Sequence, residues 1–572
     1  MKEKNNLNLE TSPYLQQHKG NPVHWQTWNK NTLNFAKVNK KPILLSIGYS
    51  SCHWCHVMAH ESFEDKETAN LMNKYFLNIK VDREERPDID FIFQSSYQLF
   101  NQAGGGWPLT MFLDENATPF MAGTYFPKIN SHGLPSFKEV ILKVGETYRQ
   151  QNKEIIKQSP IISKSLELKK SHVLNQDLES LLQNIIANLD EEKGGYKGSP
   201  KFPVFNIYDS LLFFFNKTKN LNYLTPVELI LKQLCSQGIY DHTEGGIARY
   251  TVDENWLIPH FEKMLYDNAQ FILLLSKYLE IKKNVYFEKK TIQTIEFINK
   301  NFFNPESKLL GSAYDADSEG EEGKYYVYDY EELKNIKDIS QYFDIKPEGN
   351  WEKKIILREI QLPPESLVLE LKKLRRKKIK PFFDNKVQLD LNCIWVSALV
   401  CSEKVLPNNN FLVIAEAYYG NLEKIFFNKE KLQHTILKSE VFLEDYAYSI
   451  AMLLDLFDQT LKPSYLLKAK GLCKKAIELF YIKEKSIFQK NVVATNDIFH
   501  KPIDISDGNI PSGNSIMLLN FTRLKMKNEA KELSDSLNGY LNVYKSLMVS
   551  SIKSIEYFNM LEFSGTCTDK GC

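Results

Sequence analysis

The chain is poor in cysteine, has almost no net charge and lacks long apolar runs. Eight cysteines among 572 residues are too few for a disulfide-stabilised scaffold. With 72 basic and 71 acidic side chains the formal charge is +1, so no global field attracts nucleic acid or an anionic membrane. The longest apolar runs, such as FILLL at 271–275, are too short to span a bilayer, and the N-terminal residues lack the apolar core of a signal peptide. We therefore expect a cytoplasmic protein that binds neither nucleic acid nor a membrane.

The composition is that of a folded protein with more than one domain. Hydrophobic residues make up 43% and charged residues 25% of the chain, close to globular averages. A length of 572 residues exceeds what one hydrophobic core usually organises. Near residue 170 the pattern changes from alternating strands and helices to recurring amphipathic helices. The sequence therefore predicts an α/β domain over residues 1–165 and an all-α domain over residues 171–572.

One pair of cysteines, Cys52 and Cys55, forms a C-x-x-C motif within SIGYSSCHWCHVMAHESF. The motif directly follows KPILLSIGY, which has the pattern of a strand buried on both faces. A helix starting at the motif, then strand, helix, hairpin and helix, is the order of a thioredoxin-like domain. A thiol at the first turn of a helix meets unsatisfied backbone N–H groups, which favour the thiolate. We predict that Cys52 is the attacking sulfur and that Cys55 resolves the mixed disulfide.

Four further residues are expected to shape this site. Pro108, after GGGW, is the candidate for the cis-proline that thioredoxin-like folds place against the cysteine pair. We expect His53, Trp54 and Trp107 to border the groove that receives the thiol or disulfide of a partner protein. The stretch DREERPD, residues 82–88, is expected to be a surface turn, although it follows a strand end where sites can lie.

Zinc is the main alternative for the same motif. Cys52, Cys55, His56 and His60 offer sulfur and nitrogen ligands, and the two histidines have the i, i+4 spacing of one helix face. The sequence has no second C-x-x-C or H-x3-H at ligand spacing, and the preceding buried strand is what a redox helix requires. The redox interpretation is therefore favoured, with neither metal nor cofactor expected, while zinc and inert packing stay open.

In the second domain the helices are joined by loops that alternate between short and long. The long loops are rich in glycine, aromatic and acidic residues, as in YDHTEGGIARYTVDENWLIP and GSAYDADSEGEEGKYYVY. This alternation predicts antiparallel helical hairpins in a closed toroid, with the long loops gathered on one face. No fixed-period repeat is evident in the sequence, so a solenoid is the less favoured alternative.

The long loops hold a second candidate site, for a small sugar. His260, Glu262 and Asp315 are the candidate acid and base groups, because imidazole and carboxylates can move protons or bind hydroxyls. Pro259 is expected to start a helix, which would point His260 and Glu262 in different directions. The residues expected to bind the sugar offer flat rings or carboxylates: Tyr250, Trp256, Asp267, Asp317 and Asp445. Taken singly each has a plainer interpretation, such as an Asx turn or a charge at a helix N-terminus.

One basic run stands out, KKLRRKKIKP at residues 372–381. Leu371 and Leu374 can pack inward, so we expect the run to be a solvated helix face. The neutral overall charge offers no extended footprint for nucleic acid.

Several long and unusual strings carry a family resemblance: SPYLQQHKGNPVHWQTW, GYSSCHWCHVM, KVDREERPDID, GGGWPLTMFLD, RYTVDENWLIPHFEKMLYDNA and DADSEGEEGKYYVY. They resemble the spermatogenesis-associated protein 20 family, whose bacterial members are described as thioredoxin domain-containing proteins. The match runs from about residue 7 to about residue 525. The resemblance implies a thioredoxin-like domain fused to an (α/α)6 toroid similar to six-hairpin glycosidases and N-acylglucosamine 2-epimerases. Family members are mostly of unassigned activity.

The chain departs from the family pattern in two ways. Asn385 and Leu391 stand where the family tends to have Asp and Trp, and the short tail after PSGNS suggests an incomplete last helical hairpin. Three functions follow from these observations. The chain is expected to be a thiol–disulfide oxidoreductase, a sugar epimerase or hydrolase with a regulatory redox domain, or a non-catalytic scaffold whose cysteines sense oxidants.

Overall fold

The computed structural model describes residues 4–131, 133–171, 177–427, 431–438 and 440–564. The chain divides into two units. The first comprises Met1–Leu168, Leu437–Phe442 and Gln489–Ile503, and the second comprises Lys169–Ile436, Leu443–Phe488 and Asp504–Cys572. The sequence pattern predicts one helical domain over residues 171–572, whereas the structure gives two short segments of that range to the first unit.

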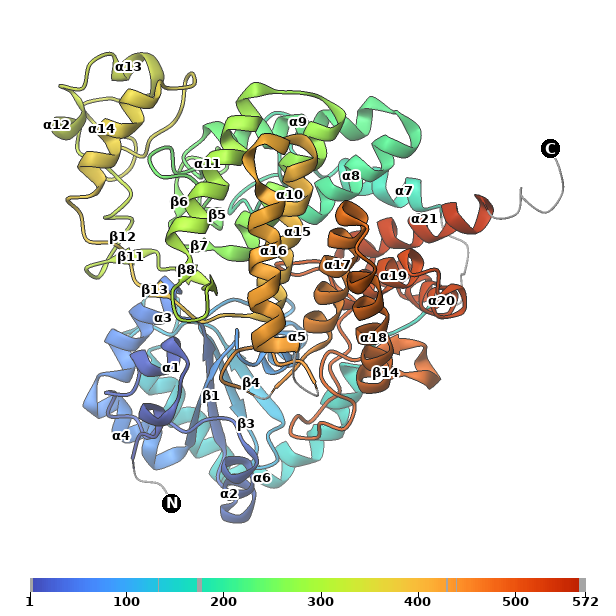
Figure 1. Ribbon diagram of the computed structural model, residues 1–572. Coiled ribbons are helices and arrows are strands. Elements are labelled where there is room, and N and C mark those ends of the chain that lie inside the picture. Colours follow the sequence, from blue (N-terminus) through green and yellow to red (C-terminus); the bar gives the residue numbers. More distant parts are fainter. Residues whose placement is uncertain (1–3, 132, 172–176, 428–430, 439, 565–572) are drawn as a thin grey trace. The chain divides into compact units, whose positions relative to one another are not determined.

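The first unit is built on a four-stranded sheet in the order β2-β1-β3-β4. β1 pairs parallel with β2 and antiparallel with β3, and β4 pairs antiparallel with β3 (Figure 1). Every residue of β1 is buried, which explains why its sequence is almost wholly apolar. The strands span Ile43–Gly48 (β1), Leu77–Asp82 (β2), Leu109–Leu113 (β3) and Pro119–Gly123 (β4).

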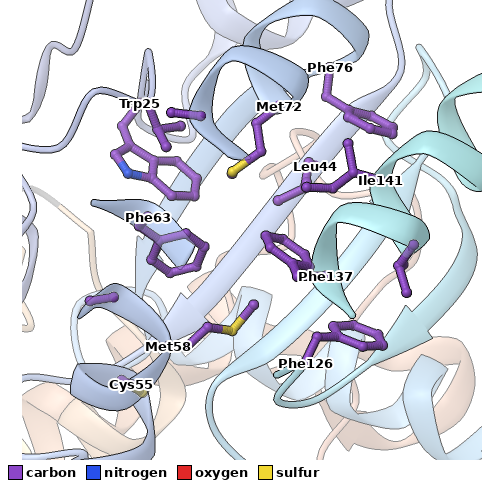
Figure 2. Close-up of a cluster of buried hydrophobic side chains, with 14 of the residues drawn as sticks. Trp25, Leu44, Cys55, Met58, Phe63, Met72, Phe76, Phe126, Phe137 and Ile141 are labelled. Carbon is purple, nitrogen blue, oxygen red and sulfur yellow. The ribbon is translucent and has the colours of Figure 1, made fainter. Parts of the chain in front are cut away.

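Two apolar clusters pack against β1, one on each face. Leu44 contributes to the cluster that contains Phe63 and Phe137 (Figure 2). The alternate residues of the strand contribute to the other cluster, together with Ile89 and Phe93 of α5. The mixed sheet with helices on both faces is the thioredoxin-like architecture that the sequence predicts. The helices span Pro13–Gln17 (α1), Lys30–Asn39 (α2), His53–Met58 (α3), Lys66–Tyr75 (α4), Pro87–Asn101 (α5) and Phe137–Ser165 (α6).

The second unit is a closed ring of helical hairpins. Within the described residues, six inner helices contact one another in the cyclic order α8, α10, α15, α17, α19, α21 and back to α8. Each of them packs against one outer helix, in the order α9, α11, α16, α18, α20 and α7. The predicted (α/α)6 toroid is therefore confirmed.

The ring helices have ordinary lengths for a globular protein. The inner ones span Phe205–Thr218 (α8), Leu265–Ile281 (α10), Leu389–Val405 (α15), Leu443–Thr460 (α17), Gly513–Arg523 (α19) and Val549–Ser564 (α21). The outer ones span Leu221–Ser236 (α9), Val285–Asn301 (α11), Phe411–Leu422 (α16), Pro463–Phe480 (α18), Lys527–Tyr544 (α20) and Leu178–Ile186 (α7).

The last hairpin is complete, so the expectation of an incomplete one is wrong. α21 contacts both of its neighbours among the inner helices, and its outer partner is α7. Because α7 comes from the beginning of the unit, the ring closes without a further helix after α21.

Short strands and helices shape the loops between these hairpins. β7, β10 and β13 form a three-stranded antiparallel sheet in the order β13-β10-β7. A group of three short helices packs around its own apolar cluster, which includes Leu333, Phe343 and Leu371. These elements span Tyr250–Thr251 (β5), Pro259–His260 (β6), Lys263–Met264 (β7), Phe303–Asn304 (β8), Leu309–Leu310 (β9), Ala313–Tyr314 (β10), Asp317–Ser318 (β11), Glu321–Glu322 (β12), Phe383–Asp384 (β13), Tyr481–Ile482 (β14), Ile487–Phe488 (β15), Tyr330–Leu333 (α12), Ile339–Tyr342 (α13) and Glu365–Arg375 (α14).

The basic run at residues 372–381 is not a fully solvated face, contrary to the prediction. Leu371 is buried as expected, but Arg375 is buried as well. Its guanidinium donates to the carboxylate of Asp241 at 3.0 Å and to the carbonyl oxygen of Tyr326 at 2.9 Å. Arg375 therefore joins α14 to the loops of the ring.

Candidate functional site

Cys52 and Cys55 lie where β1 ends and α3 begins, and they form a disulfide. Cys52 is the N-cap of α3, and its Sγ accepts a hydrogen bond from the backbone N–H of Cys55 at 3.2 Å. Such a hydrogen bond stabilises a thiolate once the disulfide is reduced. The predicted placement of the pair after a buried strand and at a helix start is confirmed. The assignment of Cys52 as attacking sulfur and Cys55 as resolving sulfur stays a prediction.

Pro108 immediately precedes β3 and lies near the carboxyl end of β1. The Trp107–Pro108 peptide bond is cis, as predicted. β3 begins with Leu109, which pairs with Ile47 of β1 in antiparallel register. The register therefore brings Pro108 to the end of β1 from which the C-x-x-C motif departs.

Trp107 is held by two residues that no sequence motif indicated, Asp90 and Arg83. Its indole N–H donates to Oδ1 of Asp90 at 2.8 Å, and the guanidinium of Arg83 lies 3.9 Å from a ring centroid of the indole. Arg83 lies 3.6 Å from the carboxylate of Asp90 and also faces the ring of Tyr49. Burial raises the pKa of Asp90, although the charge of Arg83 and the hydrogen bond from Trp107 act in the opposite direction.

The stretch at residues 82–88 forms the predicted turn, but it is largely buried, so its placement on the surface is wrong. Its acidic side chains are buried at all four positions: Asp82, Glu84, Glu85 and Asp88. Arg86 binds Asp88 in a bidentate pair, at 2.9 and 2.8 Å. The signal that the sequence offered was the position of so many charges directly after a buried strand.

His53 and Trp54 follow Cys52 on α3. The rings of His53 and Trp54 meet edge to face with centroids 5.6 Å apart, and Trp54 also contacts Tyr125 at 5.2 Å. Trp54 is 48% exposed, unlike the two cysteines, of which Cys52 is 3% and Cys55 1% exposed. An exposed aromatic ring beside a disulfide offers a flat contact surface for a partner protein. The role of both residues in substrate binding stays a prediction.

The zinc alternative requires a ligand set that this conformation does not assemble. Both cysteines are in the disulfide, and Nδ1 of His60 lies 3.1 Å from a carboxylate oxygen of Glu64. The side chain of His60 is 70% exposed. Among the residues that the structure describes, the group with metal-ligand spacing lies elsewhere, at Asp390, His434 and Asp445.

His260 and Glu262, the predicted acid and base of the toroid, lie close together. The structure starts α10 at Leu265 instead of Pro259, so the predicted helix start is wrong and His260 belongs to the extended β6. Nε2 of His260 lies 3.7 Å from Oε1 of Glu262, and its Nδ1 lies 2.5 Å from Oε1 of Glu322. Because the chain is extended at His260, side chains two residues apart can point to the same side, whereas a helix would have separated them.

The carboxylate of Glu262 is tied to a buried cation. Glu262 is fully buried, and Nη1 of Arg249 lies 3.0 Å from its Oε1. Next to this pair, the rings of Phe202 and Tyr250 stack with centroids 4.6 Å apart, and Tyr250 lies 5.0 Å from the ring of His260. Aromatic rings beside an imidazole and carboxylates are the groups expected of a sugar site.

The other residues predicted to bind a sugar differ in their burial and in their hydrogen bonds. Trp256 is fully buried, and its indole N–H donates to the carbonyl oxygen of Lys193 at 2.7 Å, so its ring has no exposed face for a ligand. Asp267 is buried in the first turn of α10. The backbone N–H of Asp317 donates to Oδ1 of Asp315 at 3.1 Å, which is the Asx turn of the plainer interpretation.

Asp445 belongs to a buried group of three side chains, of which it alone was predicted from the sequence. Nδ1 of His434 lies 2.8 Å from Oδ1 of Asp445 and 3.9 Å from Oδ1 of Asp390. Burial raises the pKa of Asp390 to about 7, with the negative charge of Asp445 adding to the effect and His434 opposing it. The three side chains come from α15, α17 and the loop between α16 and α17. Their spacing could hold a metal ion or share a proton.

A cavity of about 400 Å³ lies among the inner helices, and all six contribute side chains to it. None of the predicted sugar-site residues lines this cavity. Five of its charged groups form ion pairs: Asp209 binds both Lys277 and Lys553, and Arg523 lies 2.9 Å from Asp455. These residues gave no local motif in the sequence, because they come from separate helices and meet only in the ring.

Comparison with known proteins found a family model that matches the first part of the chain and relatives that align with most of its length. Residues 4–167 match the family model Thioredox_DsbH, described as a protein of unknown function, DUF255. Spermatogenesis-associated protein 20 of Homo sapiens is 29% identical, with 91% of this chain and 76% of that protein aligned. The Rattus norvegicus protein of the same name is 28% identical, over 96% of this chain and 79% of its own length.

These relatives confirm the predicted resemblance to spermatogenesis-associated protein 20. Among solved structures, a cellobiose 2-epimerase from Bacillus thermoamylovorans aligns with a TM-score of 0.42 and 12% identity, covering 65% of this chain and 86% of its own. A GH76 α-mannanase from Bacteroides thetaiotaomicron aligns with a TM-score of 0.42 and 9% identity, covering 69% and 98%. No helix in the described parts of the chain is long and apolar enough to cross a membrane. The cytoplasmic location stays a prediction.

Proposed function

We propose that the chain is a thiol–disulfide oxidoreductase whose reacting groups are Cys52 and Cys55. The observation that supports this most directly is the disulfide at the first turn of α3, with Cys52 Sγ accepting the backbone N–H of Cys55. The cis-Pro108 at the neighbouring strand end and the exposed Trp54 beside the pair support it further. The substrate is a protein or small molecule that carries a thiol or a disulfide.

In the reducing direction the thiolate of Cys52 attacks one sulfur of the substrate disulfide. A bond forms between Cys52 and that sulfur, and the other sulfur leaves as a thiolate. Cys55 then loses its proton and attacks Cys52, which releases the second substrate thiolate and forms the Cys52–Cys55 disulfide. The two electrons gained by the substrate are those lost by the cysteine pair.

The test is insulin reduction together with trapping of the mixed disulfide. We expect the wild type to reduce insulin, Cys52→Ser to lose the activity, and Cys55→Ser to accumulate a mixed disulfide with the substrate. Cys401→Ser is the control, because Cys401 is a free cysteine on α15 outside the C-x-x-C motif. A wild-type protein that reduces neither insulin nor small disulfides would refute the proposal.

A second proposal is that the toroid binds a small neutral sugar at His260. The stacked rings of Phe202 and Tyr250, next to His260 and its two carboxylate neighbours, favour it over a purely structural toroid. We expect a set of mono- and disaccharides to raise the melting temperature of the wild type and not that of His260→Ala. Product analysis of the ligand that shifts it would separate epimerisation from hydrolysis, and the absence of any shift would end this proposal.

A further inference from the structure

Three side chains with metal-ligand chemistry meet where two neighbouring inner helices begin. Asp390 lies in the first turn of α15, Asp445 lies in the first turn of α17, and His434 lies in the loop between α16 and α17. One possible ligand atom from each residue lies within 4.8 Å of the other two. All three residues are at most 6% exposed. The group differs from an exposed acidic cluster, because water does not screen the charges of buried side chains.

The backbone holds His434 against the start of α15. Its carbonyl oxygen accepts the backbone N–H of Leu389 at 2.9 Å, and the next residue, Thr435, forms an antiparallel bridge with Gln388. The imidazole therefore comes from a segment that is fixed to the same helix as Asp390. Ligand groups that are positioned in advance lose little conformational freedom when they bind an ion.

The contacts of Gln388 indicate which imidazole nitrogen of His434 carries a proton. Oγ of Ser312 lies 2.8 Å from the carbonyl oxygen of Lys386 and 2.7 Å from one end of the Gln388 carboxamide. The other end of the carboxamide lies 3.4 Å from Nε2 of His434. A hydroxyl has one proton to donate, and the two ends of a carboxamide have the same shape. Both contacts of Ser312 receive a proton only if the near end is the NH2 group, and the carboxamide oxygen then accepts the N–H of His434 Nε2.

With a proton on Nε2, the Nδ1 of His434 needs a cation beside it. Nδ1 lies 2.8 Å from Oδ1 of Asp445 and 3.9 Å from Oδ1 of Asp390, and carboxylates at these distances repel a bare lone pair. The cation is either a second proton, which makes an imidazolium ion pair, or a metal ion bound by all three side chains. A proton neutralises one of the two carboxylates, whereas a divalent ion neutralises both. A hydrogen bond from Nε2 to an oxygen acceptor is also the outer contact that metal-bound histidines usually make.

We propose that Asp390, His434 and Asp445 bind a divalent transition-metal ion, such as Zn²⁺ or Mn²⁺. The inference goes beyond both proposed functions and depends on neither. Zinc bonds of about 2.1 Å place tetrahedral ligand atoms roughly 3.4 Å apart, so each distance from Nδ1 to a carboxylate needs to change by roughly half an ångström. One imidazole nitrogen with two carboxylate oxygens suits these ions better than Ca²⁺, which prefers oxygen ligands alone. Three protein ligands leave a coordination position for water or a substrate.

A buried thiol one turn further along α15 is not part of this ligand set. Cys393 lies three residues after Asp390, and its Sγ contacts Oγ of Ser449 at 3.4 Å. Among the described residues, the group with metal-ligand spacing does not include its sulfur. We therefore expect nitrogen and oxygen ligands only, which distinguishes the ion from one bound at the C-x-x-C motif.

The experiment is a titration of the full chain with Zn²⁺ and with Mn²⁺ after removal of metals by a chelator. Calorimetry gives the affinity, and elemental analysis of the dialysed protein gives the metal bound to each chain. Asp390→Asn keeps the shape of the side chain and should weaken the binding of the preferred ion at least about 100-fold, because it removes a charged ligand. Gln388→Leu removes the contact to Nε2 of His434 and should weaken binding about 10–100-fold. Asp535→Asn changes an exposed carboxylate on α20 and should leave the affinity unchanged.

A variant without the C-x-x-C thiols assigns the ion to its site. The double variant Cys52→Ser, Cys55→Ser should keep the metal, and its Co²⁺ complex should lack the charge-transfer band that a thiolate ligand gives. Loss of the metal in this variant would overturn the proposal, as would a wild type that binds neither ion or binds both no more tightly than Asp390→Asn does. Circular dichroism verifies that each variant is folded. If Asp390→Asn does not fold, Gln388→Leu decides, because it keeps all three ligands, and wild-type affinity in that variant would then overturn the site.

Discussion

Sγ of Cys55 packs directly against the backbone of Gly48, so that a Cβ added there would lie 2.7 Å from the sulfur. Distances below 3.0 Å are essentially never seen for real Cβ atoms. The same Cβ would lie 2.3 Å from the hydroxyl oxygen of Tyr14. The glycine before the C-x-x-C motif is therefore required by space, because both neighbours are buried and cannot move aside freely.

Gly48→Ala should lower the free energy of unfolding by roughly 1–3 kcal/mol, since overpacking a buried site forces side chains and backbone to shift. Urea unfolding followed by tryptophan fluorescence measures the change. Gly104→Ala is the matched control, because a Cβ at Gly104 meets nothing within 4 Å. Equal stability of the two variants would contradict the packing at Gly48.

Trp107→Phe should destabilise the first unit by roughly 1–3 kcal/mol. The change removes the indole N–H that donates to Oδ1 of the buried Asp90 at 2.8 Å, which leaves that oxygen only the long contact with Gln94 at 3.5 Å, and losing a hydrogen bond to a buried carboxylate is costly. Trp54→Phe is the control, because Trp54 is 48% exposed and such surface changes stay within about 0.5 kcal/mol. Thermal and urea unfolding of both variants should separate them clearly, and a Trp107→Phe protein as stable as Trp54→Phe would disprove the role of this hydrogen bond.

Asp241→Asn should cost the toroid roughly 3–5 kcal/mol, because it leaves two buried cations without their shared counter-charge. Oδ2 of Asp241 lies 2.7 Å from Nζ of Lys263 and 3.0 Å from Nη1 of Arg375. Asp535→Asn breaks only an exposed pair with Lys531 and should change stability by less than about 1 kcal/mol. Calorimetry on both variants provides the comparison. An equal loss of unfolding free energy in the two variants would contradict this role of Asp241.

Glu359 should make the stability of the toroid sensitive to acid. Burial would raise its pKa, but the hydrogen bond with His242 and the charge of Lys290 outweigh burial and hold the pKa at about 2, against an ordinary value of 4.5. A depressed pKa contributes stability above the unfolded value of 4.5, and that stability is lost as the pH falls toward 2. The advantage of the wild type over Glu359→Gln should therefore shrink by about 2 kcal/mol between pH 6 and pH 3.

Urea unfolding at both pH values tests this dependence. The control is Glu370→Gln, which changes an exposed side chain on α14. Its difference from the wild type should be the same at both pH values. A difference for Glu359→Gln that is equally independent of pH would show that the buried contacts with Lys290 and His242 do not lower the pKa of Glu359.

Local patterns predicted the features of the fold that depend on neighbouring residues. The apolar run before Cys52, the helix start at the motif and the cis bond at Pro108 all follow from short stretches of sequence. The ring of hairpins was also predicted, because amphipathic helices keep their period whatever they pack against.

The predictions that were wrong or incomplete concern features that depend on contacts between residues distant in the sequence. Pro259 is suited to a helix start, but the chain there continues in the extended β6, which pairs with β5. Arg375 belongs to a basic run, and only the distant Asp241 explains its burial. His434 and Asp390 join Asp445 from separate elements, so no spacing in the sequence could bring them together.

The segment 489–503 completes the first unit from far along the chain. Arg86 donates to Asp497 across a separation of 411 residues, and the rings of Phe93 and Phe499 lie 5.9 Å apart. When the residues of the four-stranded sheet leave the ribosome during translation, residues 489–503 have not yet been synthesised. The first unit therefore stays incomplete, with the face of α5 that receives Phe499 uncovered, until nearly the whole polypeptide has been translated.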